Sequence, residues 1–187
     1  MAIQQQLQTI EDYEQFIITH PDASYELING TIVEKVVTQK HAQIVSNING
    51  ELYIYFKKNR DIKGHFGPEA RFTPKDDNYN SRLPDISVHL TDEPIVEEGA
   101  VHGMPTLAVE VKSPSQTVQE MRDKAQFYLS NGCRMVWLIF PENRLVEIYE
   151  PDTDIQLITD EDAIVSAGDV LPDFEISLSD IFETFAD

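Results

Sequence analysis

The most informative pattern of apolar and polar positions is a short buried strand that carries two charges. Residues 105–115 (PTLAVEVKSPS) hold an apolar run from Leu107 to Val111, and the prolines and serines that follow end the strand. Because side chains alternate along a strand, Glu110 and Lys112 are expected on one face and the apolar side chains on the other. Burying a carboxylate and an ammonium is costly unless a partner compensates them. We therefore expect chemistry near this strand.

Before that strand, the spacing of apolar residues predicts two helices and a hairpin. Helical spacing covers residues 9–19 and again about residues 40–59, where the run ends in cations suited to a helix C-terminus. Between them, residues 25–35 form two apolar runs around Asn29-Gly30, a strong signal for a β-hairpin.

The remaining pattern alternates strands with helices. The strand at 105–115, the helix after it and the next strand form a βαβ crossover, which is expected to be right-handed with parallel strands. Ser113 or Ser115 is expected to cap that helix. The expected elements are strands at 69–74, 82–90, 134–140, 145–149 and 155–158, a loop at 91–104, and helices at 115–130 and about 179–185.

Length and composition fit one soluble unit. The 187 residues are enough for a sizeable core, so residues 1–187 are expected to form a single domain. A hydrophobic share of 41% argues against wholesale disorder. The one cysteine, Cys133, excludes an internal disulfide, and no signal sequence or long apolar span is found. We expect a cytoplasmic protein without membrane contact.

The net charge of −19 is unusual for a protein that binds nucleic acid. Residues 1–34 hold six acids and residues 145–187 hold thirteen, and neither segment contains Lys or Arg. The other 14 acids lie among all 14 Lys and Arg residues, so the middle of the chain is neutral. The acidic ends are either a solubilising surface or a field that opposes DNA unless they fold away from the binding face.

Three polar residues lie on or beside the inward faces of the predicted helices. His41 and Glu51 flank the apolar stripe of the helix at 40–59, and each is either a boundary residue reaching solvent or part of a site. Lys124 lies on the inward stripe of the helix at 115–130, unless it pairs with Glu120 on the rim.

The candidate chemistry combines Asp85 with Glu110 and Lys112. Asp85 opens the predicted strand at 82–90, behind a proline. Two carboxylates from adjacent strands can hold a hard divalent cation such as Mg²⁺, which polarises a phosphoryl oxygen and helps to generate hydroxide. A nearby lysine can orient the water or stabilise developing charge. These are the parts needed for phosphodiester hydrolysis.

Other kinds of site have little support in the sequence. No glycine-rich phosphate loop is found, and the five histidines do not follow a zinc-binding spacing. Cys133 leads into an apolar strand and is interpreted as a small core residue rather than a nucleophile.

Several segments together resemble the Uma family of bacterial "putative restriction endonucleases", part of the PD-(D/E)xK nuclease superfamily. The resemblance runs from about Tyr25 to the end of the chain and is more specific than the Glu-x-Lys pattern alone. The matching segments are YELING from Tyr25, the helix opening at His41, RLPDI from Arg82, LAVEVKSPS from Leu107, RDK from Arg122 with Tyr128, and residues 132–139.

That resemblance implies an α/β (α+β) restriction-endonuclease-like fold, with a central mixed β-sheet flanked by helices and an N-terminal hairpin. It implies that Asp85 and Glu110 bind Mg²⁺ or Mn²⁺, with His41 or Glu26 completing the site. Many family members have an apolar residue at the position of Lys112 and a lysine at that of Lys124. This chain has both, so the catalytic role is open between them.

The expected function is therefore a metal-dependent endonuclease that hydrolyses DNA, working as a homodimer because cutting both strands favours two sites related by two-fold symmetry. The alternative is a catalytically silent relative that serves as a binding or regulatory module. The acidic charge favours that alternative, because each phosphate contact needs a cation.

Overall fold

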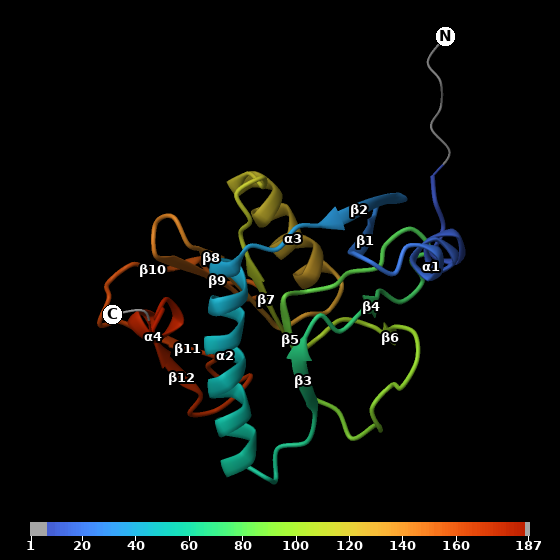
Figure 1. Ribbon diagram of the computed structural model, residues 1–187. Coiled ribbons are helices and arrows are strands. Elements are labelled where there is room, and N and C mark those ends of the chain that lie inside the picture. The colour runs from blue at the N-terminus through green and yellow to red at the C-terminus, as the bar shows by residue number, and fades with distance from the viewer. Residues whose placement is uncertain (1–6, 186–187) are drawn as a thin grey trace.

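The computed structural model describes residues 7–185, and a six-stranded mixed sheet forms its centre (Figure 1). Across the sheet the strand order is β10-β9-β8-β7-β5-β3, and only β7 and β8 are parallel neighbours. This confirms the predicted parallel pair. The strands are β3 (His65–Pro68), β5 (Ile86–His89), β7 (Leu107–Val111), β8 (Met135–Phe140), β9 (Leu145–Tyr149) and β10 (Gln156–Ile158).

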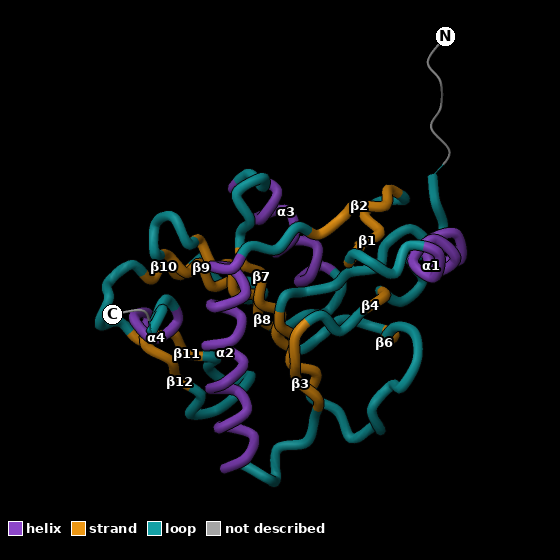
Figure 2. The backbone as a smooth tube through the Cα atoms, in the orientation of Figure 1, coloured by secondary structure: helices purple, strands orange, loops and turns teal. Residues whose placement is uncertain are grey.

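The long helix α2 (Gln39–Lys58) covers one face of the sheet (Figure 2). The sequence predicts an inward stripe of Ile44, Ile48, Leu52 and either Tyr55 or Phe56. In the structure Tyr55 is the buried one, and the stripe packs against the apolar side of β5, β7 and β8. The C-terminal elements β11 (Ile164–Ser166), β12 (Glu175–Ser177) and α4 (Leu178–Ile181) add apolar side chains to the same core.

Helix α3 (Val118–Ser130) covers the opposite face. Met121, Ala125 and Tyr128 are fully buried there, together with side chains from β7 and β8 that alternate with those facing α2. Thr117 caps the helix in a reciprocal capping box with Glu120. The prediction of a cap at Ser113 or Ser115 was wrong, because the Thr-x-x-Glu box satisfies two backbone donors at once.

The predicted hairpin is formed by β1 (Ser24–Ile28) and β2 (Thr31–Lys35), which pair in antiparallel register around Asn29-Gly30. Both turn residues have positive φ, at 49° and 73°, as a tight two-residue turn requires. Helix α1 (Ile10–Thr19) packs against β1, and the Tyr13 hydroxyl donates to the backbone carbonyl of Tyr25 at 2.6 Å. The hairpin forms its own two-stranded sheet beside the central one.

Short elements account for most of the departures from the sequence pattern. Residues 69–74 contain only β4 (Phe72–Thr73), which pairs with β6 (Val101–His102) inside the expected loop, while β3 provides the sheet edge. Two-residue strands are too short to show the alternation of apolar and polar residues that identifies a strand in a sequence. The predicted final helix is shorter than expected, and β11 and β12 were missed.

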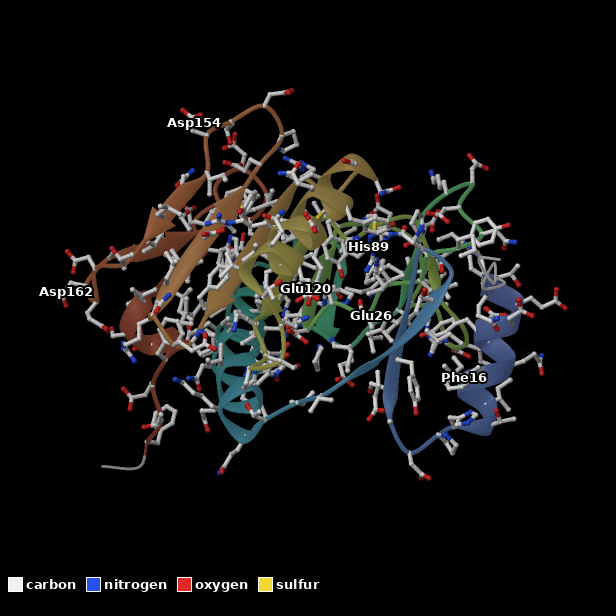
Figure 3. All side chains as sticks on the ribbon, turned by 90° about the horizontal axis from the view of Figure 1, so that it is seen from above. Phe16, Glu26, His89, Glu120, Asp154 and Asp162 are labelled. Atoms are coloured by element: carbon white, nitrogen blue, oxygen red, sulfur yellow. The ribbon has the colours of Figure 1, made fainter. Side chains whose placement is uncertain are left out.

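Two surface properties bear on function. No helix in residues 7–185 is long and apolar enough to cross a lipid bilayer. Asp154 and Asp162, from the acidic C-terminal segment, lie at one edge of the molecule, well away from Glu26 and Glu120 near its middle (Figure 3).

Candidate active site

Asp85 lies directly before β5, and both of its carboxylate oxygens are occupied. The residue is buried, with 3% of its surface exposed. Oδ1 accepts a hydrogen bond from Lys35 Nζ at 2.7 Å, and Oδ2 lies 2.9 Å from His41 Nε2. Oδ2 also accepts from the backbone N–H of Val111 at 2.7 Å. Because Val111 belongs to β7, that bond ties Asp85 to the strand that carries Glu110.

Glu110 is the one polar side chain of β7, and it lies on the face covered by α3. Its Oε2 is 2.8 Å from Lys124 Nζ, and its Oε1 accepts from the Tyr128 hydroxyl at 2.8 Å. Lys124 Nζ also lies 3.2 Å from Oε2 of Glu26, on the hairpin. The other oxygen of Glu26 accepts from the backbone N–H of Leu83 at 3.0 Å. Hairpin, sheet and helix therefore meet at one buried charged network.

Burial disfavours every charge in this network, and the neighbouring groups decide the direction of each pKa. For Asp85, burial raises the pKa, but Lys35, His41 and Lys124 together outweigh it and hold the pKa well below the ordinary value. For Glu110, burial raises the pKa and Lys124 only partly opposes that rise. For Lys124, burial lowers the pKa, but Glu110 and Glu26 outweigh it and raise the pKa above the ordinary value. Asp85 and Lys124 are thus held in their charged forms.

These groups form the floor of a cleft of about 760 Å³ between the hairpin and α3. In Figure 3, Glu26 on the hairpin and Glu120 on α3 lie close to the middle of the molecule, on the elements that form the two walls. The walls also carry Val36 and Phe127. The cleft is large enough for a small part of a polymeric substrate, and its titratable groups lie at the bottom.

Lys112 lies outside this network. Its Nζ is 3.0 Å from Glu142 Oε1 and 3.3 Å from the backbone carbonyl of Ser113, and it does not line the cleft. The expected juxtaposition of Lys112 with Glu110 is therefore not present. The reason is local: β7 ends at Val111, so strand alternation no longer fixes the direction of the next side chain.

The other polar residues near the helices now have definite positions. His41 is buried and bonded to Asp85, whereas Glu51 is exposed to solvent. Lys124 is buried between carboxylates, so the alternative of a pair with Glu120 on the rim was wrong.

Two cations of the cleft were not identified from the sequence. Lys35 ends β2, and its ion pair with Asp85 spans 50 residues of sequence. Arg82 is buried over the ring of Phe127. The available signals were weak: Lys35 is the first cation of the chain, and Arg82 stands three residues before Asp85.

The donor set has the chemistry that a hard divalent cation prefers. Asp85 and Glu110 offer carboxylate oxygens, and His41 Nδ1 is buried without a hydrogen-bond partner among the described residues. In the present arrangement, the four oxygens of Asp85 and Glu110 all accept hydrogen bonds from the protein. Within residues 7–185, no three His, Cys, Asp or Glu side chains are grouped as a ready metal site. The carboxylate chemistry of Asp85 and Glu110 therefore fits such an ion, while each of their oxygens is held by a donor of the protein.

Two comparisons with known proteins gave matches. The Uma2 family, described as "Putative restriction endonuclease", matches residues 10–179. The crystal structure of a "putative nuclease belonging to DUF820" from Anabaena variabilis ATCC 29413 is similar in fold, with a TM-score of 0.78. The two sequences are 27% identical over 93% of this chain and 97% of that one. None of the curated proteins matches.

The family match covers both strands and the helix that form the network, from the hairpin through α3. The structural neighbour extends the likeness over nearly the whole chain. The mixed sheet with a helical layer on each face is the restriction-endonuclease-like fold expected from the sequence, and the chain belongs to the Uma2 family.

Proposed function

We propose that this protein is a nuclease that hydrolyses DNA phosphodiester bonds with the help of Mg²⁺ or Mn²⁺. The observation that carries the proposal is the meeting of Asp85, directly before β5, with Glu110 on the neighbouring strand β7, beside Lys124 on the floor of the cleft. Membership of the Uma2 family and the nuclease title of the structural neighbour support it.

In this proposal Asp85 and Glu110 hold the ion, and His41 or Glu26 completes its surroundings. When bound, the ion polarises a phosphoryl oxygen and lowers the pKa of a water molecule. Asp85 is suited to its role because its carboxylate stays ionised even at acid pH. The apolar sheet behind it limits water and strengthens the electrostatic interactions at the floor.

Lys124 is the better candidate for the catalytic lysine. Its ammonium is held 2.8 Å from Glu110, and its raised pKa keeps it charged over the working range of pH. From that position it can orient a water molecule or stabilise the charge that develops on the phosphate. Lys112, bonded to an exposed carboxylate elsewhere, has no such position.

Cleavage of supercoiled plasmid with Mg²⁺ or Mn²⁺ tests the proposal. We expect Glu110→Ala and Lys124→Ala to lower the rate by at least about 100-fold, and Lys112→Ala to change it less than about three-fold. Lys112→Ala is a matched control because it removes the same side chain 12 positions away. Equal cleavage by wild type and Glu110→Ala would mean a contaminating nuclease, and loss of activity only in Lys112→Ala would reverse the assignment of the lysine.

A catalytically silent binding module is the second candidate, favoured by the complete set of protein hydrogen bonds to Asp85 and Glu110. Calorimetric titration with Mn²⁺ separates the two. Binding that disappears in Asp85→Asn supports the nuclease, and no binding by wild type supports the silent module. Sedimentation at the concentration of the cleavage assay measures whether the chain forms the dimer that a double-strand cut favours.

A further inference from the structure

Among residues 7–185, Arg82 is a buried cation that forms no ion pair with a carboxylate. Only 4% of its surface is exposed, and its guanidinium carbon lies 4.0 Å from the centre of the Phe127 ring. Its one side-chain hydrogen bond is a long one, from Nη2 to Asn80 Oδ1 at 3.4 Å. Nε is buried without a hydrogen-bond partner in residues 7–185, and no ion pair involves Arg82 in that range.

The other two buried cations of the cleft differ from Arg82 in this respect. Lys35 and Lys124 are each paired with a carboxylate. Glu26 lines the cleft too, but its oxygens are bonded to Lys124 and to a backbone N–H. Arg82 interacts with the Glu26 carboxylate electrostatically, without an ion-pair contact. Burying a guanidinium with no carboxylate in direct contact is costly, so the position favours an anion that binds there directly.

The backbone and the aromatic ring hold Arg82 in place. Its N–H and carbonyl each bond to the backbone of Phe72, at 2.8 Å in both directions. The stacking on Phe127, at the α3 wall, restricts the plane of the guanidinium. A guanidinium fixed in this way presents a flat fork of donors, which matches two oxygens of a phosphate better than an ammonium does.

We propose that Arg82 binds a phosphate group of the nucleic-acid strand that enters the cleft. The choice of phosphate as the anion rests on the proposed function. Arg82 comes three residues before Asp85 and lines the same cleft, so a strand held by Arg82 passes over the charged floor. Arg82 therefore fixes the position of the substrate relative to Asp85 and Glu110.

The test is the affinity of a short DNA duplex, measured by fluorescence anisotropy with EDTA present so that no cleavage occurs. We expect Arg82→Gln to weaken binding by about ten-fold or more and to lower the slope of log K against log salt by about 1. Arg82→Lys keeps the charge but not the fork, and is expected to fall between wild type and Arg82→Gln. Inorganic phosphate should raise the thermal midpoint of wild type more than that of Arg82→Gln.

Arg71→Gln is the matched control. Arg71 also lies over an aromatic ring, that of Tyr13 at 5.5 Å, and its Nε is also buried without a partner in the described residues, but it does not line the cleft. It should bind DNA as wild type does. Circular dichroism checks the fold of each variant. If Arg82→Gln does not fold, the DNA affinity of Arg82→Lys is compared with that of Arg71→Lys instead.

Each outcome has a definite meaning. Equal affinity and equal salt slope for wild type and Arg82→Gln overturn the inference, as does an equal loss in Arg71→Gln. If wild type binds neither DNA nor phosphate in EDTA, the inference is also wrong, and cleavage with Mg²⁺ would then leave the proposed function standing. A loss of binding confined to Arg82 variants in a protein that never cleaves DNA would support the inference and refute the nuclease.

Discussion

At the scale of single residues, the main feature is the contact of Lys35 with Asp85, the carboxylate that holds the divalent ion in the proposed function. The ammonium is 2.7 Å from Oδ1, and both side chains are at least nine-tenths buried. Burial lowers the pKa of Lys35, but Asp85 and Glu110 outweigh it and raise the pKa, so the lysine remains charged. A divalent ion bound at Asp85 would repel this ammonium, so the ion and Lys35 compete for the same carboxylate.

We therefore expect Lys35→Met to bind Mn²⁺ at least about ten-fold more tightly than wild type, because the competing charge is gone. Without metal the same variant should lose about 2–4 kcal/mol of unfolding free energy, since a buried carboxylate loses its cation. Calorimetry gives the affinity, and urea unfolding with and without Mn²⁺ gives the stability.

Lys112→Met is the control for this prediction, because Lys112 pairs with Glu142, which is half exposed. It should leave Mn²⁺ affinity unchanged and cost less than about 1 kcal/mol. Weaker Mn²⁺ binding by Lys35→Met would instead mean that Lys35 helps to hold the site together.

The sequence predicted some of these residues and not others for a physical reason. Glu110 and Lys124 were found because each sits on a regular element, where periodicity shows the side that it faces, and Asp85 was found because it directly precedes such an element. Lys35 and Arg82 reach the cleft through contacts between segments distant in sequence. Periodicity carries no information about such contacts.

At the scale of elements, the hairpin supplies both Glu26 and Lys35 to the site, so its turn matters for more than β1 and β2. Gly30 has a φ of 73°, and its N–H donates to the Tyr79 carbonyl at 2.7 Å. A Cβ built on Gly30 would lie 2.7 Å from the Cβ of Leu7, closer than real side chains approach. The turn is thus fixed by conformation and by packing together.

Gly30→Ala is therefore expected to lower the unfolding free energy by about 1–3 kcal/mol. Gly50→Ala is the matched substitution. Gly50 lies on the exposed side of α2, and a Cβ built there meets nothing within 4 Å, so alanine should stabilise by about 0.5–1 kcal/mol. Urea unfolding of both variants measures the difference, and stabilisation by Gly30→Ala would contradict the account of the turn.

The long helices and the hairpin were predicted correctly from the sequence, and the short strands were not. The helices at 9–19 and 40–59 and the hairpin agree with α1, α2 and the β1–β2 pair to within a residue or two. The strand expected at 69–74 largely failed, because β4 contains two residues and is held by pairing with β6. Strands of two or three residues depend on tertiary partners that their own sequence does not reveal.

At the scale of the whole molecule, the position of the acidic residues matters more than their number. None of the acids in residues 145–185 lines the cleft, and Asp154 and Asp162 lie at a remote edge of the molecule in Figure 3. The mouth of the cleft nevertheless carries exposed carboxylates, among them Glu34 on the hairpin and Asp123 on α3. These lie on the path of an approaching phosphate chain and oppose it over about 10 Å at ordinary ionic strength.

We expect the double variant Glu34→Gln, Asp123→Asn to bind DNA about two- to five-fold more tightly than wild type at low salt, with the gain fading as salt screens the field. The control is Asp154→Asn, Asp162→Asn, which changes the net charge from −19 to −17 in the same way but at a remote edge. Fluorescence anisotropy between about 50 and 300 mM salt compares the two. We expect a larger gain in DNA affinity for the double variant at the mouth of the cleft, because a screened electrostatic field acts only over a short distance. Equal gains would mean that net charge alone controls binding and that DNA does not approach through this cleft.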